Sequence, residues 1–130
     1  MLLDTSVLVE LLRRPATDPL VKRILELVDD RPLFASPIHM GELADAARKG
    51  NLSPREVVDK ALQIVELLPL DADTAVLASD LKAEARRRKN GKGFSLIDGV
   101  GLATARTRGL PMLTMDAEFD GFEGVTVLGR

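Results

Sequence analysis

The sequence predicts an α/β protein with a mainly parallel sheet of four or five strands among six helices. Two observations lead to this prediction. Short apolar runs alternate along the chain with longer amphipathic stretches, which is typical of repeated strand–helix units. The 130 residues are 45% hydrophobic and 29% charged, a composition typical of a globular chain with one core. A single domain over residues 1–130 is therefore expected.

Five short apolar runs are predicted as strands. They span residues 1–3, 32–36, 67–71, 111–114 and 125–128. The first run ends at Asp4, and the fourth is followed after one residue by Asp116. Both acidic residues therefore stand just beyond the ends of predicted strands.

Six helices are predicted between these strands, and several of them begin at residues that cap helices. Ser53 and Glu56 have the spacing of a capping box, and so do Ser95 and Asp98. The expected starts are Thr5 or Ser6, Pro19 after Asp18, Pro37 after Ser36, Pro54 after Ser53, Ala72, and the residue after Ser95. The expected ends include Arg13-Arg14-Pro15, Gly50, about Lys89, and Arg108 before Gly109.

The composition excludes several classes of function. The chain has no cysteine, which excludes disulfides, thiolate metal sites and a cysteine nucleophile, and this fits a cytoplasmic location. We expect no signal peptide and no contact with a membrane, because no apolar stretch approaches spanning length. The net charge of −2 gives no overall attraction to nucleic acid.

Four acidic residues stand where solvated surface positions are not expected. Asp4 and Asp116 follow strands, while Asp98 lies in the first turn of a predicted helix and Glu42 in the second turn of another. In a parallel sheet the carboxyl ends of the strands meet at one edge, where ligands bind. These four side chains can therefore converge at that edge.

Each of the four acidic residues also has a purely local explanation. Asp4 can bond backbone N–H groups at the start of its helix, and Asp98 can serve as a capping residue. Glu42 can lie on the surface, and Asp116 can form a turn. Taken together, however, clustered carboxylates repel one another unless a cation lies among them. Mg²⁺ or Mn²⁺ is the cation that such oxygen ligands favour.

Four segments in this order resemble the PIN-domain family, and in particular the small VapC-type toxin ribonucleases. The resemblance covers essentially the whole chain and rests on "MLLDTSVLVELL", "ASPIHMGELADAARKG", "SLIDGVGLATARTRG" and "LPMLTMDAEFDGFEGVTVL". It implies a three-layer α/β/α sandwich with the strand order 3-2-1-4-5. The two glycines of "DGVGLA" are a mild departure that suggests close backbone packing at that helix.

The resemblance also implies an activity and a site. The activity is that of a metal-dependent endoribonuclease, with Mg²⁺ or Mn²⁺ held by carboxylates. The implied catalytic and metal-binding residues are Asp4, Glu42, Asp98 and Asp116, supported by Ser6 (preferred over Thr5) and Thr114. Participation of Asp120 or His39 stays open, although a turn residue and a partly buried or surface histidine are the favoured interpretations.

The implied partners are an RNA substrate, a neutralising antitoxin and a second copy of the chain in a homodimer. One basic segment can contact RNA phosphates, namely Arg86, Arg87, Arg88, Lys89 and Lys92. A solvated helix end explains the same segment equally well, and an antitoxin contact is a third option. Two other functions stay open: a non-catalytic PIN-like module that binds RNA or protein, and another Mg²⁺-dependent phosphate hydrolase.

Overall fold

The computed structural model describes residues 1–129, which form five strands, six α-helices and one 3₁₀ helix. The strands are β1 (Leu2–Leu3), β2 (Phe34–Ala35), β3 (Glu66–Leu67), β4 (Met112–Thr114) and β5 (Val125–Val127). The helices are α1 (Thr5–Arg13), α2 (Pro19–Val28), α3 (Pro37–Lys49), α4 (Pro54–Leu62), α5 (Ala72–Arg86), α6 (Leu96–Thr107) and η1 (Ala117–Phe119).

The five strands form one parallel sheet in the order β3-β2-β1-β4-β5, as the resemblance implies. The first strand is central: Leu2 is in register with Phe34 of β2 on one side and with Met112 of β4 on the other. Because β1 and β4 are parallel neighbours, the residues that follow them emerge together at the carboxyl edge of the sheet.

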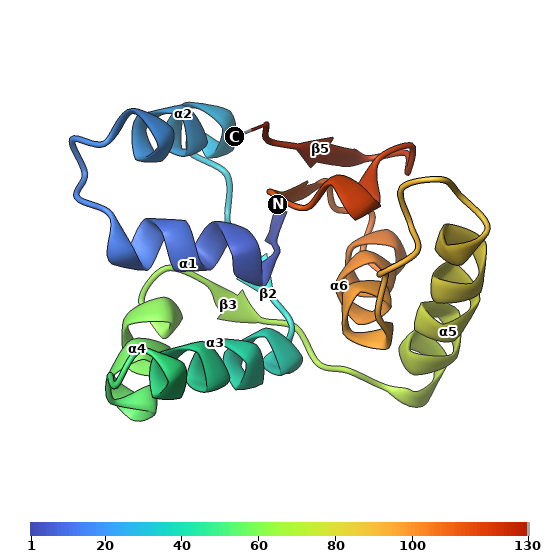
Figure 1. The fold of residues 1–130 in the computed structure, drawn as a ribbon, viewed down its shortest axis with the longest axis horizontal. Coiled ribbons are helices and arrows are strands. Elements are labelled where there is room, and N and C mark those ends of the chain that lie inside the picture. Colours follow the sequence, from blue (N-terminus) through green and yellow to red (C-terminus); the bar gives the residue numbers. More distant parts are fainter. Residues whose placement is uncertain (130) are drawn as a thin grey trace.

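Successive residues of the central strands pack into different cores. Leu3 and Leu113 contribute to a core with α1, α2, α3 and α4, whereas Leu2 and Met112 contribute to a core with α5 and α6. This alternation follows from the pleat of a strand, which turns successive side chains to opposite faces. Figure 1 shows α5 and α6 together on the right, apart from α1 to α4 on the left. The predicted three-layer α/β/α sandwich is therefore confirmed.

Most of the predicted caps are confirmed. Asp18 accepts a hydrogen bond from the backbone N–H of Leu20 at 2.8 Å, and Ser36 caps α3. Ser95 and Asp98 form a reciprocal capping box at the start of α6. At α4, the hydroxyl of Ser53 accepts from the backbone N–H of Glu56, but within residues 1–129 the Glu56 side chain does not accept from the Ser53 backbone N–H, so the predicted capping box is only half formed.

Several predicted boundaries are shifted. The third strand is Glu66–Leu67 rather than 67–71, since Pro69 has no N–H for the ladder. Helix α5 ends at Arg86 rather than near Lys89, because the chain folds back until Gly91 lies against the helix end. A Cβ on Gly91 would stand 1.9 Å from the carbonyl oxygen of Ala85.

Close packing of α6 on α5 explains one of the two glycines that follow Asp98. A Cβ on Gly99 would lie 2.4 Å from the carbonyl oxygen of Ala78 in α5. The predicted close approach of backbones is therefore confirmed. Among the helices of residues 1–129, none is long and apolar enough to cross a membrane.

Candidate functional site

Asp4 lies at the carboxyl end of β1, between two strands of the sheet. Its backbone N–H donates to the carbonyl oxygen of Leu113 in β4 at 3.0 Å, which joins it to the neighbouring strand. The residue is the N-cap of α1, yet its side chain accepts no capping hydrogen bond. The local explanation of Asp4 as a helix cap is therefore wrong for its side chain, which is buried and turned to other partners.

Two hydroxyl groups hold one oxygen of Asp4. Ser6 Oγ and Thr114 Oγ1 each donate to Asp4 Oδ2 at 2.8 Å. The same hydroxyl oxygens accept backbone N–H groups, Ser6 from Met115 at 3.0 Å and Thr114 from Asp116 at 3.0 Å. Each hydroxyl thus donates its single proton to Asp4, and its oxygen accepts a hydrogen bond from the backbone of the segment that follows β4. These bonds orient the carboxylate of Asp4 relative to the segment that carries Asp116.

Asp116 directly follows this network and begins η1. Its Oδ1 accepts from the backbone N–H of Glu118 at 2.9 Å, so the expected turn-forming role is confirmed. The turn uses only this oxygen. Asp116 Oδ2 accepts no hydrogen bond from residues 1–129.

Asp98 reaches the same edge from the first turn of α6. Its Oδ2 accepts from the backbone N–H of Ser95 at 2.8 Å. Burial is the main cause that raises the pKa of Asp98 to about 6, and the negative charges of Asp4 and Asp116 add to the effect. Electrostatics therefore couples Asp98 to the two acidic residues that follow the strands.

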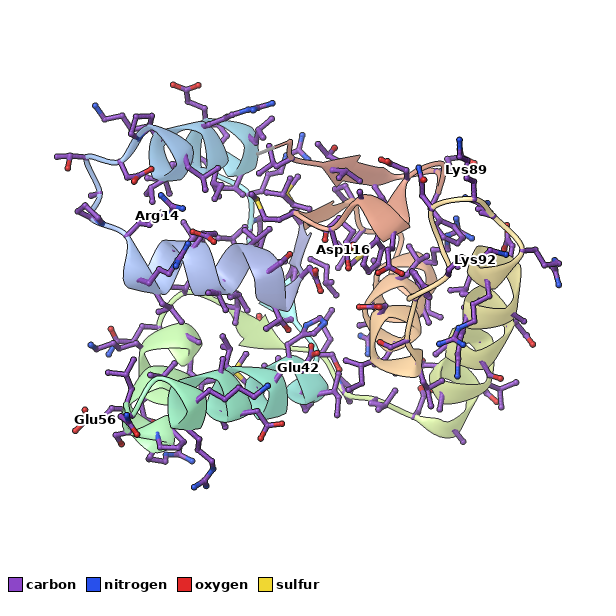
Figure 2. All side chains as sticks on the ribbon, viewed as in Figure 1. Arg14, Glu42, Glu56, Lys89, Lys92 and Asp116 are labelled. Carbon is purple, nitrogen blue, oxygen red and sulfur yellow. The ribbon has the colours of Figure 1, made fainter. Side chains whose placement is uncertain are left out.

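Glu42 extends the acidic group from α3. Thr5 Oγ1 donates to Glu42 Oε1 at 2.6 Å, a bond between α1 and α3. Burial raises the pKa of Glu42, and the charges of Asp4 and Asp45 raise it further. Figure 2 shows Glu42 and Asp116 toward the middle of the molecule, on segments that flank β1. Thr5 is thus a third supporting hydroxyl, beside Ser6 and Thr114, although Ser6 was preferred over Thr5 from the sequence.

The four carboxylates share one feature that fits them for a hard cation. Each uses one oxygen in hydrogen bonds within the protein and keeps the other, namely Asp4 Oδ1, Glu42 Oε2, Asp98 Oδ1 and Asp116 Oδ2, outside any hydrogen bond to residues 1–129. No Lys or Arg of the described residues pairs with any of them. Oxygen donors without a local counter-charge are what Mg²⁺ and Mn²⁺ select.

The acidic residues are nevertheless not closed into a ready metal cage. Within residues 1–129, no three Asp, Glu, His or Cys side chains form a group that could hold a metal ion as they stand. Like charges repel at short range, so carboxylates on separate elements approach closely only around a cation. The donor chemistry fits a metal, and binding would require side-chain movement.

His39 lies deeper than the sequence indicated. The expectation of a partly buried or surface histidine is wrong, because the side chain is completely buried. Its Nδ1 accepts from the backbone N–H of Ser36 at 3.2 Å and completes a capping box at α3. Burial lowers the pKa of His39, while the nearby charge of Asp4 opposes that shift. The pattern of apolar residues in the sequence does not show whether a histidine at the N3 position of a helix is buried, as His39 is, or exposed.

The basic segment runs from the end of α5 into the connection to α6 and is partly used in structural contacts. Figure 2 shows Lys89 and Lys92 at the right edge, at the connection from α5 to α6. Arg86 donates to the carbonyl oxygen of Phe94, and Lys92 to that of Arg86. Arg88 pairs with Glu84 and lies 3.9 Å from the centre of the Phe122 ring. A role of this segment in binding RNA phosphates stays a prediction.

Asp120 serves as the residue that ends η1. Its backbone N–H donates to the carbonyl oxygen of Ala117, and its carbonyl oxygen accepts from Arg88. The favoured interpretation of Asp120 as part of a turn is therefore confirmed. A role for its exposed side chain at the acidic group stays untested.

Comparisons with known proteins identify relatives of this fold. The PIN domain family matches residues 1–124. A toxin–antitoxin complex from Klebsiella pneumoniae is 25% identical with a TM-score of 0.74, covering 97% of this chain and 95% of that chain. A DNA-bound VapBC from Salmonella typhimurium is 24% identical with a TM-score of 0.70, covering 98% and 95%. VapC20 of Mycobacterium tuberculosis, described as a sarcin–ricin loop cleaving toxin, is 21% identical with a TM-score of 0.65, covering 92% and 89%. The comparison with curated proteins gave no match.

Proposed function

Because this chain belongs to the PIN-domain family, we propose that it is an endoribonuclease that hydrolyses RNA phosphodiester bonds. We further propose that it is the toxin of a type II toxin–antitoxin pair, with a cognate antitoxin as its partner. Support comes from the solved relatives, which include toxin–antitoxin complexes and a toxin described as cleaving the sarcin–ricin loop. A homodimer and action in the cytoplasm, where RNA substrates are present, belong to the same proposal.

Asp4, Glu42, Asp98 and Asp116 are the proposed metal-binding and catalytic residues. The observation that carries this assignment is the pattern of their oxygens. Each carboxylate is oriented through one oxygen and leaves the other outside any hydrogen bond to residues 1–129. Capping or turn formation alone gives no reason to bring these acids within range of one another's charge, which raises the pKa of Asp98 and of Glu42.

The chain's own residues have distinct tasks in this proposal. Ser6 and Thr114 keep Asp4 Oδ2 fixed, so that Asp4 Oδ1 is the oxygen left for a ligand. In the metal-free protein, the raised pKa of Asp98, about 6, means that a cation binding below that pH has to displace a proton from this carboxyl group. When bound, Mg²⁺ or Mn²⁺ supplies positive charge that activates water and stabilises charge developing on the scissile phosphate.

RNA cleavage by the purified chain, free of antitoxin, tests this proposal. We expect cleavage in Mg²⁺ or Mn²⁺, no cleavage in EDTA, and a loss of at least about 100-fold in Asp4→Asn, because one charged ligand becomes neutral. Asp59→Asn is the matched control: it makes the same chemical change in α4, where Asp59 pairs with Arg55. That variant should cleave as the wild type does.

Two results would contradict the proposal in different ways. A wild-type chain that cuts no RNA in any divalent metal ion would remove the nuclease assignment. Full activity in Asp4→Asn would keep the activity but remove Asp4 from the site. Cleavage that does not elute with the chain in gel filtration would identify a contaminating nuclease, so that such a contaminant is not mistaken for an active Asp4→Asn variant.

A further inference from the structure

The imidazole of His39 has a defined protonation pattern. Its Nδ1 accepts a hydrogen bond from the backbone N–H of Ser36 at 3.2 Å. A neutral imidazole that accepts at Nδ1 carries its proton on Nε2. His39 therefore presents a fixed N–H group at Nε2, held in place by the capping box at the start of α3.

This N–H group is buried and has no hydrogen-bond partner. Nε2 of His39 is one of two such buried side-chain atoms among the described residues. The carboxylate oxygen Asp4 Oδ1 stands 4.0 Å away, beyond the length of a hydrogen bond. Buried donors in folded proteins are nearly always paired, so an unpaired one beside a site calls for an explanation.

We propose that His39 is a positioning residue of the candidate site, whose Nε2–H group holds Asp4 Oδ1 in the working arrangement of the carboxylates. The inference rests on the proposed function. Closing the separation to a hydrogen bond takes a shift of about 1 Å, well within side-chain adjustment. Asp4 would then be held from three elements: by Ser6 of α1, by Thr114 of β4 and by His39 of α3. Asp4 Oδ1 has two lone pairs, so it can accept from His39 and still bind a cation.

The geometry explains why such a donor is useful at this position. Two hydroxyls bond Asp4 Oδ2, whereas Asp4 Oδ1 accepts no hydrogen bond from residues 1–129. A donor on Asp4 Oδ1 adds a direct restraint on that oxygen and offsets the repulsion from the neighbouring acids. Groups that orient metal-binding side chains typically change metal affinity or activity about 10–100-fold when they are removed. His39 itself touches no substrate in this proposal.

Gly101 of α6 provides the space that the imidazole occupies. A Cβ at Gly101 would stand 3.0 Å from His39 Nε2 and 3.3 Å from Cε1. The imidazole of His39 thus explains why residue 101 is a glycine, just as the Ala78 carbonyl oxygen explains the glycine at residue 99. Gly101→Ala consequently displaces Nε2 without removing it, which makes it an independent perturbation of the same contact.

Two substitutions separate positioning from helix capping. In His39→Asn, the amide oxygen can still accept from Ser36, as Asp98 does from Ser95 at the equivalent position of α6, but no donor reaches the Nε2 position. In His39→Gln, an amide N–H stands about where Nε2 stood. We expect kcat for RNA cleavage to fall about 10–100-fold in His39→Asn and Gly101→Ala, and clearly less in His39→Gln. The KM should change little.

Binding of Mn²⁺ alone provides a readout that does not depend on cleavage. Electron paramagnetic resonance titration should give the same ranking of affinities, with His39→Gln closer to wild type than His39→Asn. A purely structural role of His39 predicts losses that follow the thermal stability of each variant instead. Equal Mn²⁺ affinity in wild type and His39→Asn would overturn the inference.

A spectroscopic test uses the fact that His39 is the chain's one histidine, so a tag-free sample gives a single set of ring signals. In ¹H–¹⁵N spectra, we expect protonation at Nε2 and not at Nδ1, and a shift of the Nε2–H signal in Asp4→Asn but not in Asp59→Asn. A proton on Nδ1, or a signal insensitive to Asp4→Asn, contradicts the inference.

The combined results separate this inference from the proposed function. If the chain cuts no RNA but the Mn²⁺ ranking and the Asp4-dependent shift hold, the nuclease proposal fails and the role of His39 stands. If the wild type cuts RNA and His39→Asn cuts it equally well, the nuclease proposal stands and the role of His39 fails.

Discussion

Thr114→Val is the most informative single substitution outside the acidic residues themselves. Thr114 is completely buried, and valine has nearly the same shape, so the change removes hydrogen bonds without opening a cavity. Two bonds are lost: one from Thr114 Oγ1 to the Asp4 carboxylate at 2.8 Å, and one from the backbone N–H of Asp116 at 3.0 Å.

The expected cost follows from the kinds of bond involved. A hydrogen bond to a charged group contributes about 1.5–3 kcal/mol to stability and a neutral one about 0.5–1.5 kcal/mol. The free energy of unfolding should therefore fall by about 2–4 kcal/mol. For a urea m-value of about 2 kcal/mol/M, this lowers the midpoint by about 1–2 M without a change in m.

Thr104→Val is the matched control. Thr104 is also buried, but its hydroxyl donates at 2.7 Å to the carbonyl oxygen of Val100 in its own helix, which is a neutral bond. Its expected cost is about 0.5–1.5 kcal/mol. Urea unfolding is measured in EDTA, because a bound metal ion would add its own stabilisation.

A double-mutant cycle identifies the partner of Thr114. Combined with Asp4→Asn, Thr114→Val should show a coupling energy of about 1 kcal/mol, the difference between a charge-assisted and a neutral hydrogen bond. If the two Thr→Val variants lose equal stability, or if the cycle gives no coupling, the hydroxyl of Thr114 does not hold Asp4 and the derivation of the site is refuted.

Two further predictions concern packing and charge. Gly99→Ala should destabilise the fold, because its Cβ would meet the Ala78 carbonyl oxygen at 2.4 Å. Gly41→Ala has open space around it and should stabilise α3 by up to about 1 kcal/mol in urea unfolding. If both substitutions changed the free energy of unfolding in the same direction, the packing argument would be refuted. The raised pKa of Asp98, about 6, lowers the stability of the metal-free protein as pH rises from about 4 through 6, because the folded state binds the proton more tightly than the unfolded state. Asp98→Asn should therefore raise Tm at pH 7.5 and change it little at pH 4.5, and a pH-independent difference would contradict this.

The sequence by itself determined the fold class and the order of the elements. Alternation of apolar runs with amphipathic stretches depends on neighbours within one helical turn or one strand, so it is visible in the chain. Caps such as Asp18 and the Ser95–Asp98 pair are local for the same reason. The strand order was predicted from the resemblance to a family and not from periodicity. A connection that carries the chain from one strand across the sheet to a distant one leaves no pattern in the local sequence.

Helix and strand ends were the least predictable local features. Gly50 was expected to close α3, and the helix does end before it, but the left-handed residue is Asn51, with φ of 56°. Helix α5 stops early because the following loop returns over its end, which is a contact between segments and not a property of the helix.

Only the tertiary structure decided how the acidic residues are held. The bond from Thr114 to Asp4 joins residues 110 positions apart, and that from Thr5 to Glu42 joins residues 37 apart. Both depend on which strands pair and on how α1 and α3 face each other, and no sequence window contains that information. The burial of His39 also depends on tertiary packing, because α6 can cover the imidazole at Gly101, where no side chain stands in the way. The sequence thus supplied the carboxylates, and the packing of β1 against β4, α3 and α6 determined which of their oxygens stay open for a ligand.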